Sequence, residues 1–281
     1  MFKSQMFDTA LAGFSHNIPL TTNFKIFKHF SVSAGTNYTE NWVFNTNEKF
    51  YNTTTNTVET VRKNGFDAYR TYNFTSSIGT TVYGTYTFKE TNKIQAIRHL
   101  MRPSISYGYT PSFDEYYQQY TDNSGNYIDY SRFENTLFGA PGKGISNSMG
   151  FSLANSLEAK VLDNDSKKGE TKKISLLNQF NFSTAYNFAA EKFKLSPISF
   201  IGGTTLFDNK LGINFGAQFD PYDLDENNDR IDEFSLSNGN GLARMTSSNI
   251  TINYSVTSND FSKEKKSKQN VQNGGREDDL F

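Results

Sequence analysis

The sequence predicts an all-β fold, and two observations lead to this prediction. Apolar residues alternate with small polar residues over long stretches, which is the two-residue period of a β-strand and fits a helix poorly. Only 36% of the 281 residues are hydrophobic, yet 26 are Phe and 16 are Tyr. Aromatic residues favour strands, and a chain this rich in them is not largely disordered.

The clearest alternation runs from Phe66 to Phe88. The even positions form the mainly apolar set: Phe66, Ala68, Arg70, Tyr72, Phe74, Ser76, Ile78, Thr80, Val82, Gly84, Tyr86 and Phe88. The odd positions between them hold mostly small or polar residues. Successive side chains of a strand point to opposite faces, so Ile78 is expected on one face and Ser77 on the other.

The same alternation recurs along the rest of the chain. Its apolar positions include Phe30, Val32 and Tyr38; Met101, Ile105 and Tyr109; Phe151, Leu153 and Val161; Ile174, Phe182 and Phe188; Leu211, Ile213 and Phe219; and Ile250, Ile252 and Tyr254. No apolar stripe of helical length with capping residues stands out. We therefore predict about nine strands, at 18–27, 30–47, 65–88, 97–112, 146–161, 173–189, 197–206, 211–222 and 244–256.

The length and composition of these strands favour a membrane barrel over a soluble sandwich. Strands of soluble sandwiches have about five or six residues, whereas several of these exceed the 9–11 or so that cross a bilayer. The polar face is rich in Ser, Thr, Asn and Gly, as in a wet lumen, and aromatic residues lie near strand ends, as in interfacial girdles. The predicted fold is an antiparallel transmembrane outer-membrane β-barrel.

The connections between the predicted strands support this architecture, because most of them are alternately short and long, as in outer-membrane barrels. We expect residues 1–257 to form the barrel segment, with long surface loops at 48–64, 113–145 and 223–243. Residues 258–281 are polar and without alternation, so we expect a disordered periplasmic segment there.

Composition excludes several classes of function. The 28 Lys and Arg residues nearly balance the 29 Asp and Glu residues, so no nucleic-acid partner is expected. Without cysteine, the chain has no disulfide, thiolate metal site or catalytic thiol, and its three histidines do not predict a histidine-built metal centre. No Ser-His-Asp arrangement or facing pair of carboxylates is evident, so we predict that the protein is not an enzyme.

Two charged residues, Glu40 and Arg70, interrupt the apolar faces of their strands. They flank the 48–64 loop, so both should lie at a similar height, beyond the hydrocarbon, where the strands extend past the bilayer. An Arg at the bilayer midplane would cost about 2–4 kcal/mol, which favours this placement. A more specific hypothesis is that Glu40 and Arg70 contact lipopolysaccharide head groups.

An acidic stretch from Asp223 to Glu233 is the strongest candidate for a metal site. Oxygen-bearing side chains at Asp223, Asp225, Asn227 and Asp229 have the alternate spacing that Ca²⁺ ligands use, although Asn228 stands where an EF-hand has its turn glycine. The alternative is a solvated acidic surface loop. Calcium is the only cofactor that the sequence suggests.

Several segments, in this order, resemble the LptD-like lipopolysaccharide-assembly proteins of the Bacteroidetes group. They are Arg98–Phe113 (RHLMRPSISYGYTPSF), Phe138–Gly144 (FGAPGKG), Phe151–Lys160 (FSLANSLEAK), Lys172–Leu177 (KKISLL), Ser196–Phe200 (SPISF), Thr204–Phe207 (TTLF), Phe219–Tyr222 (FDPY) and Leu242–Thr246 (LARMT). The resemblance implies an outer-membrane translocon that passes lipopolysaccharide to the outer leaflet. It also implies a very large barrel, a plug lipoprotein and periplasmic bridge proteins as partners.

The chain also departs from that family pattern. From these residues we expect no apolar leader and no receiving periplasmic domain, and nine strands is an odd number for a bacterial barrel. We therefore expect a partial barrel: a curved, open wall with edges at 18–27 and 244–256. Two alternatives are another large outer-membrane barrel, such as a porin or nutrient receptor, and a soluble or surface-attached β-sandwich adhesin.

Overall fold

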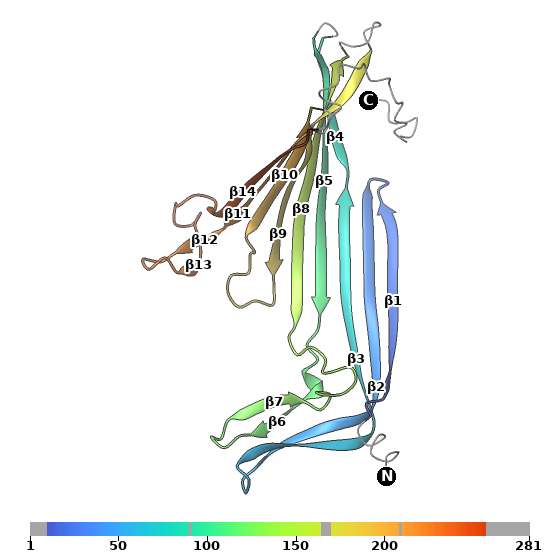
Figure 1. Cartoon of the computed structure of the whole chain (residues 1–281), viewed down its shortest axis with the longest axis vertical. Helices are drawn as coiled ribbons and strands as arrows, with labels where there is room; N and C mark the ends of the chain where they lie inside the picture. The colour runs from blue at the N-terminus through green and yellow to red at the C-terminus, as the bar shows by residue number, and fades with distance from the viewer. Residues whose placement is uncertain (1–9, 90–91, 164–169, 208–209, 257–281) are drawn as a thin grey trace.

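Figure 1 shows the computed structural model of the chain, which describes residues 10–89, 92–163, 170–207 and 210–256. The strands are β1 (Gly13–Ile26), β2 (Phe30–Asn52), β3 (Thr57–Thr80), β4 (Val82–Thr87), β5 (Ile94–Thr110), β6 (Tyr117–Thr121), β7 (Tyr127–Ser131), β8 (Ser146–Leu162), β9 (Thr171–Asn187), β10 (Ile198–Leu206), β11 (Leu211–Asp220), β12 (Tyr222–Leu224), β13 (Arg230–Phe234) and β14 (Arg244–Tyr254). The only helix in the described ranges is the three-residue 3-10 helix η1 (Asp114–Tyr116). The polar segment predicted at 258–281 lies outside these ranges.

One antiparallel sheet forms the body of the molecule. Its order is β1-β2-β3-β5-β8-β9-β10-β11-β14, with β4 also paired to β5. The hairpins β6–β7 and β12–β13 are separate two-stranded sheets. The prediction of an all-β antiparallel fold is confirmed, and the two predicted edge strands are the edges β1 and β14. No pairing joins β1 to β14 within the described residues, so the sheet is an open wall there and does not close into a barrel (Figure 1).

The hairpin of β2 and β3 is longer than the sequence indicates. Its register runs from Phe30↔Thr80 to Asn52↔Thr57, with one shift between Val43 and Asn45. Most of the surface loop expected at 48–64 is therefore strand, and only residues 53–56 connect the two arms. The pairing there is polar, as in the salt bridge between Lys63 and Glu48, so the period-two apolar pattern that marks the other strands is missing.

A proline in a central strand explains why the predicted strand 65–88 is divided. β5 pairs with β3 as far as Gly79↔Ser104 and with β4 from Val82↔Met101 onward. The interruption lies opposite Pro103, which has no N–H to donate to a neighbouring strand. On its other side Pro103 still lies in register with Leu153 of β8.

The long connections lie at the same end of their strands, although the hairpins β6–β7 and β12–β13 are well apart from each other (Figure 1). Those after β2, β5 and β11 lie at this end, and the last two contain the hairpins β6–β7 and β12–β13. The short turn at 27–29 lies at the opposite end of its strands, the end at which β4, β8 and β10 also finish. The predicted surface loops at 113–145 and 223–243 thus carry secondary structure of their own, which the short apolar runs in these segments did not reveal.

Candidate functional site

The two faces of the sheet differ sharply in chemistry. The register aligns Ile78 with Val32 on β2 and with Ile105 on β5, and Ile105 with Phe151 on β8. We call this side the apolar face. Its large side chains are unusually exposed, including Phe14 (59%), Leu20 (60%), Phe66 (62%) and Ile250 (72%). An isolated sheet with this much exposed apolar surface requires an apolar environment or partner.

The opposite side, which we call the polar face, carries small hydroxyl-bearing residues. Ser33 lies in register with Ser77 and bonds to it through their hydroxyls, at 2.7 Å. Ser104 and Ser152 form a similar pair, also at 2.7 Å. At Gly150, an added Cβ would come within 2.6 Å of the Ser106 hydroxyl oxygen, so the absence of a side chain there leaves room for this hydroxyl.

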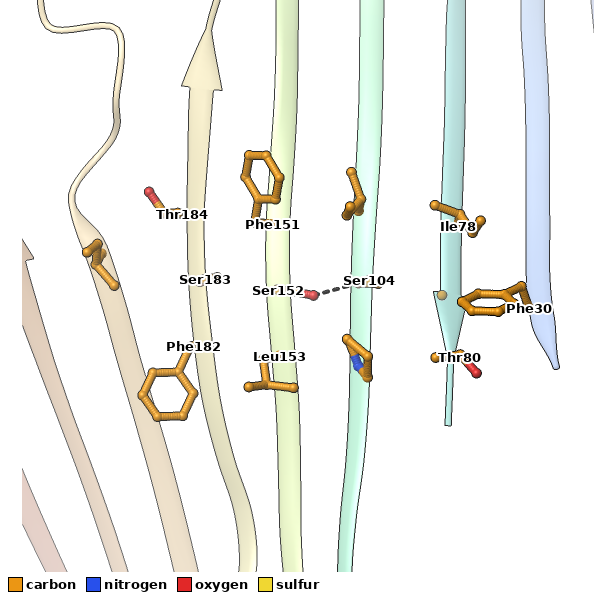
Figure 2. Close-up of a pocket in the computed structure, with 14 residues that line it drawn as sticks. Phe30, Ile78, Thr80, Ser104, Phe151, Ser152, Leu153, Phe182, Ser183 and Thr184 are labelled. Atoms are coloured by element: carbon orange, nitrogen blue, oxygen red, sulfur yellow. Dashed lines mark hydrogen bonds between the residues drawn. The ribbon is translucent and has the colours of Figure 1, made fainter. Parts of the chain in front are cut away.

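An open hollow of about 440 Å³ lies on the apolar face where the middle strands meet. Figure 2 shows Ile78, Phe151, Leu153 and Phe182 around it, contributed by β3, β8 and β9. Its lining crosses the sheet from Phe30 to β10 and includes no charged side chain. Such a surface suits hydrocarbon chains better than a polar ligand.

Glu40 and Arg70, the two charged residues predicted to share one height, are direct partners across β2 and β3. The Arg70 guanidinium lies 3.3 Å from the Glu40 carboxylate. Arg70 is 61% exposed whereas Glu40 is 20% exposed, so the cation faces outward and the carboxylate lies beneath it. This arrangement can present a positive charge to an anion that approaches the apolar face.

Aromatic side chains hold the carboxylate of Glu40 in place. The hydroxyl of Tyr38 and the indole N–H of Trp42 each donate a hydrogen bond to it, both at 2.9 Å. His16 lies in register with Glu40 on β1, and its ring meets Trp42 edge-on at 4.5 Å. The sequence could have indicated Tyr38 and Trp42, because residues two positions from Glu40 share its face. It gave no such signal for His16, whose strand pairing is non-local.

The connection between β5 and β8 folds back onto the bent end of the β2–β3 hairpin. Its Phe133 is fully buried against Val43 and Tyr69, and the rings of Tyr69 and Phe133 are 4.7 Å apart. The Arg132 side chain donates to Asp67 at 2.6 Å. The Tyr116 hydroxyl accepts a hydrogen bond from the Arg70 backbone N–H at 3.0 Å, so this segment fixes the strand that carries Arg70.

The acidic segment forms turns in place of a converging ligand set. One Asp225 carboxylate oxygen accepts the backbone N–H groups of Asn227 and Asp229, at 2.9 and 2.8 Å. Asn228 adopts the left-handed conformation, with φ of 66°, which Asn tolerates better than most residues. Among the described residues, no three His, Cys, Asp or Glu side chains are grouped so that they could hold a metal ion.

The other predicted calcium ligand, Asp223, binds elsewhere. Its carboxylate accepts hydrogen bonds from the side-chain amides of Asn238 at 3.1 Å and Asn240 at 2.7 Å. These hydrogen bonds, first from Asn238 and then from Asn240, lower the pKa of Asp223 below its usual value. Calcium binding by Asp223, Asp225, Asn227 and Asp229 stays a prediction, which calorimetry with Ca²⁺ would test.

The fold and its surfaces define a class: an antiparallel β protein whose long strands form a wall with one apolar and one polar face. Among the described residues, no helix is long and apolar enough to cross a membrane. The family model described as LptD protein matches residues 1–222, which is most of the 281-residue chain. The chain therefore belongs to the LptD protein family, and the expected resemblance is confirmed.

Membership places the chain in a family of outer-membrane proteins that act in lipopolysaccharide transport and assembly and are not enzymes. No curated protein and no solved structure matches the chain.

Proposed function

We propose that this chain forms part of the wall of an outer-membrane β-barrel that passes lipopolysaccharide to the outer leaflet. The observation that supports this most strongly is the separation of the sheet into an apolar and a polar face over strands of up to 24 residues. The apolar face would border the hydrocarbon of the bilayer, where closed sheets satisfy every backbone polar group. The polar face would line the route of the sugars while the acyl chains leave to lipid.

A complete transporter of this kind needs partners that a β-wall cannot replace. The proposed partners are a plug lipoprotein inside the barrel and periplasmic bridge proteins that deliver the glycolipid. The edges β1 and β14 expose backbone N–H and C=O groups, so in a membrane both edges must pair with further strands.

We further propose that Arg70 contacts a lipopolysaccharide head group, with Glu40 as its positioning residue. Arg70 is the exposed member of the pair, and guanidinium groups bind phosphate through paired hydrogen bonds. Replacing Arg70 by Gln should lower the amount of lipopolysaccharide that co-purifies with the full-length protein, by roughly twofold to fivefold. Lys63→Gln is the control, because Lys63 is a similarly exposed cation paired with a carboxylate. Equal retention in the two variants would contradict the contact.

Conditional depletion of the protein tests the transport function itself. The amount of newly made lipopolysaccharide at the cell surface, followed by pulse labelling, should fall before other outer-membrane proteins are lost. If surface lipopolysaccharide is maintained while the protein disappears, the proposed function is wrong.

A further inference from the structure

The polar face carries a hollow of about 510 Å³ beside the turn between β1 and β2. Lys25, Lys28, His29 and Arg102 line it, and we call it the cationic hollow. All four are exposed residues. It lies at the turn end of the β1–β2 hairpin and midway along β5 and β8, away from Glu40, Arg70 and the long connections.

The cations of this hollow have no acidic partners. Across the described parts of the chain, no carboxylate lines the hollow or forms an ion pair with Lys25, Lys28 or Arg102. By contrast, three lysines near the long connections have acidic partners: Lys49 pairs with Glu134, Lys63 with Glu48 and Lys143 with Asp129. Unpaired like charges around one hollow repel one another, and an anion between them would remove this repulsion.

The turn that presents Lys28 has a backbone conformation that is costly for its residues. Phe27 and Lys28 have φ angles of 49° and 64°, in the left-handed region that glycine or asparagine occupies most readily. A glycine or asparagine would form this turn with less strain. Positive φ angles are usual in short hairpin turns, and this turn places the lysine side chain at the hollow.

The floor of the hollow is open and rich in hydrogen-bonding groups. Ser31, Thr81 and Ser104 supply hydroxyls, and Gly79 leaves room between them. The same part of the sheet carries the apolar hollow on its other side, since Gly79, Pro103 and Ser104 border both. A single layer of backbone thus separates a surface suited to acyl chains from a surface suited to anions.

We propose that the cationic hollow binds a phosphate group of the transported glycolipid. This inference rests on the proposed function, which brings a glycolipid to the polar face. It adds that the recognised group is a phosphate and that the residues of the cationic hollow bind it. Lys25, Lys28 and Arg102 supply the charge, and charge-assisted hydrogen bonds to phosphate oxygens are stronger than neutral ones. The site lies midway along β5 and β8 on the polar face, so on the expected topology the glycolipid would meet it between entry and the end with the long connections.

The test compares two triple variants of the full-length protein purified in detergent. The first carries Lys25→Gln, Lys28→Asn and Arg102→Gln; Asn at position 28 suits the left-handed turn, so folding should be preserved. The control carries Lys63→Gln, Lys143→Gln and Lys192→Gln and removes the same charge away from the hollow. The probes are lipid A with its phosphates, dephosphorylated lipid A, and inorganic phosphate as a competitor, with binding followed by thermophoresis in mixed micelles.

We expect the first variant to bind phosphorylated lipid A at least about tenfold more weakly than the wild type, which corresponds to about 1.4 kcal/mol. The control variant should match the wild type, and dephosphorylated lipid A should bind all three proteins alike. Equal affinity of the wild type and the first variant for phosphorylated lipid A would overturn the inference. Inorganic phosphate at a concentration equal to that of phosphorylated lipid A should not displace it. Displacement of half or more of the bound lipid A would also overturn the inference, because the hollow would then be a site for free phosphate. Absence of lipid A binding by the wild type would instead count against the proposed function.

Discussion

Single carboxylates determine the conformation of the surface connections. Asp122 closes the turn between β6 and β7 by accepting the backbone N–H groups of Ser124 and Asn126, both at 2.8 Å. Asp225 does the same between β12 and β13. Side chains of Asp bond readily to the backbone two residues ahead, so acidic residues in these loops are used for turn formation.

The carboxyl group of Asp223 should titrate below the usual value of 3.8. Because its pKa is lowered in the folded protein, its contacts stabilise the loop above the unfolded-state pKa. That stabilisation is lost as the pH falls through the folded-state pKa, below about pH 4. Replacing Asn238 and Asn240 by Ala should raise the Asp223 pKa toward its ordinary value, as carboxyl carbon NMR would show. Asn227→Ala is the control, and an unchanged pKa in the double variant would refute the assigned cause.

At this scale the sequence predicts some contacts and misses others. The sequence predicts that Glu40 and Arg70 lie at a similar height relative to the bilayer, because they flank the predicted 48–64 loop. The register confirms that they are level with each other across β2 and β3. The sequence does not predict the hydrogen bond from the Arg70 backbone N–H to the Tyr116 hydroxyl, because Tyr116 lies 46 residues away in a connection. The calcium loop that its spacing suggests stays a prediction, and the sequence does not reveal that side-chain amides and backbone N–H groups bind the oxygens of Asp223 and Asp225.

At the scale of elements, the hairpin β12–β13 is fastened to the sheet by Arg230. Its guanidinium donates to both oxygens of Asp220, at 2.9 and 2.8 Å, and lies over the rings of Phe193 and Tyr222, at 4.4 and 4.7 Å. The Asp220 side chain is only 8% exposed, so it depends on this partner. A second arginine, Arg244, is more distant, at 3.6 Å.

Replacing Arg230 by Ala should therefore destabilise this hairpin by about 1.5–3 kcal/mol, the range for hydrogen bonds to charged groups. Hydrogen exchange of the backbone amides in β12 and β13 would measure the loss. Arg244→Ala should have a smaller effect, because its contact with Asp220 is longer. Equal effects of the two substitutions would show that Arg230 is not the fastening residue.

A second prediction at this scale concerns the two faces of β3. Ile78→Arg would place a charge on the apolar face, at a cost of about 2–4 kcal/mol if that face borders lipid. Ser77→Arg would place the same charge on the polar face, where it can remain hydrated. Assembly of the full-length protein, followed by its heat-modifiable migration on gels, should fail for Ile78→Arg and succeed for Ser77→Arg. Failure of both, or success of both, would contradict the assignment of the faces.

Alternation of apolar and polar residues predicts the long strands of the sheet well. It fails where polar groups pair the strands and where a neighbouring strand interrupts the pairing. The outer arms of β2 and β3 lack the apolar pattern and pair through polar groups such as Glu48 and Lys63. The alternation of residues 65–88 is continuous and predicts one strand. The structure divides it into β3 and β4 opposite Pro103 of the neighbouring strand β5. Both differences depend on the neighbouring strand, which a single segment of sequence does not reveal.

At the scale of the whole molecule, the sheet has little core of its own. In the described residues, the cluster of buried residues is confined to Val43, Tyr69 and Phe133, under the connection between β5 and β8. Elsewhere the wall buries only a few residues, such as Ala96, Ala159 and Val161, and within the described ranges no strand pairs with the outer edge of β1 or β14. A bilayer against the apolar face and further strands along both edges would supply what the sheet lacks.

The most direct test of the central claim, that the apolar face borders lipid, is a spin-label scan along β3. These 281 residues contain no cysteine, so a single cysteine at position 74, 75, 77 or 78 is the one thiol of this segment that can be labelled. In membranes, labels at Phe74 and Ile78 should collide mainly with dissolved oxygen, which concentrates in lipid. Labels at Thr75 and Ser77 should collide mainly with a water-soluble nickel complex. Equal access of the nickel complex to all four positions would contradict a lipid-facing wall.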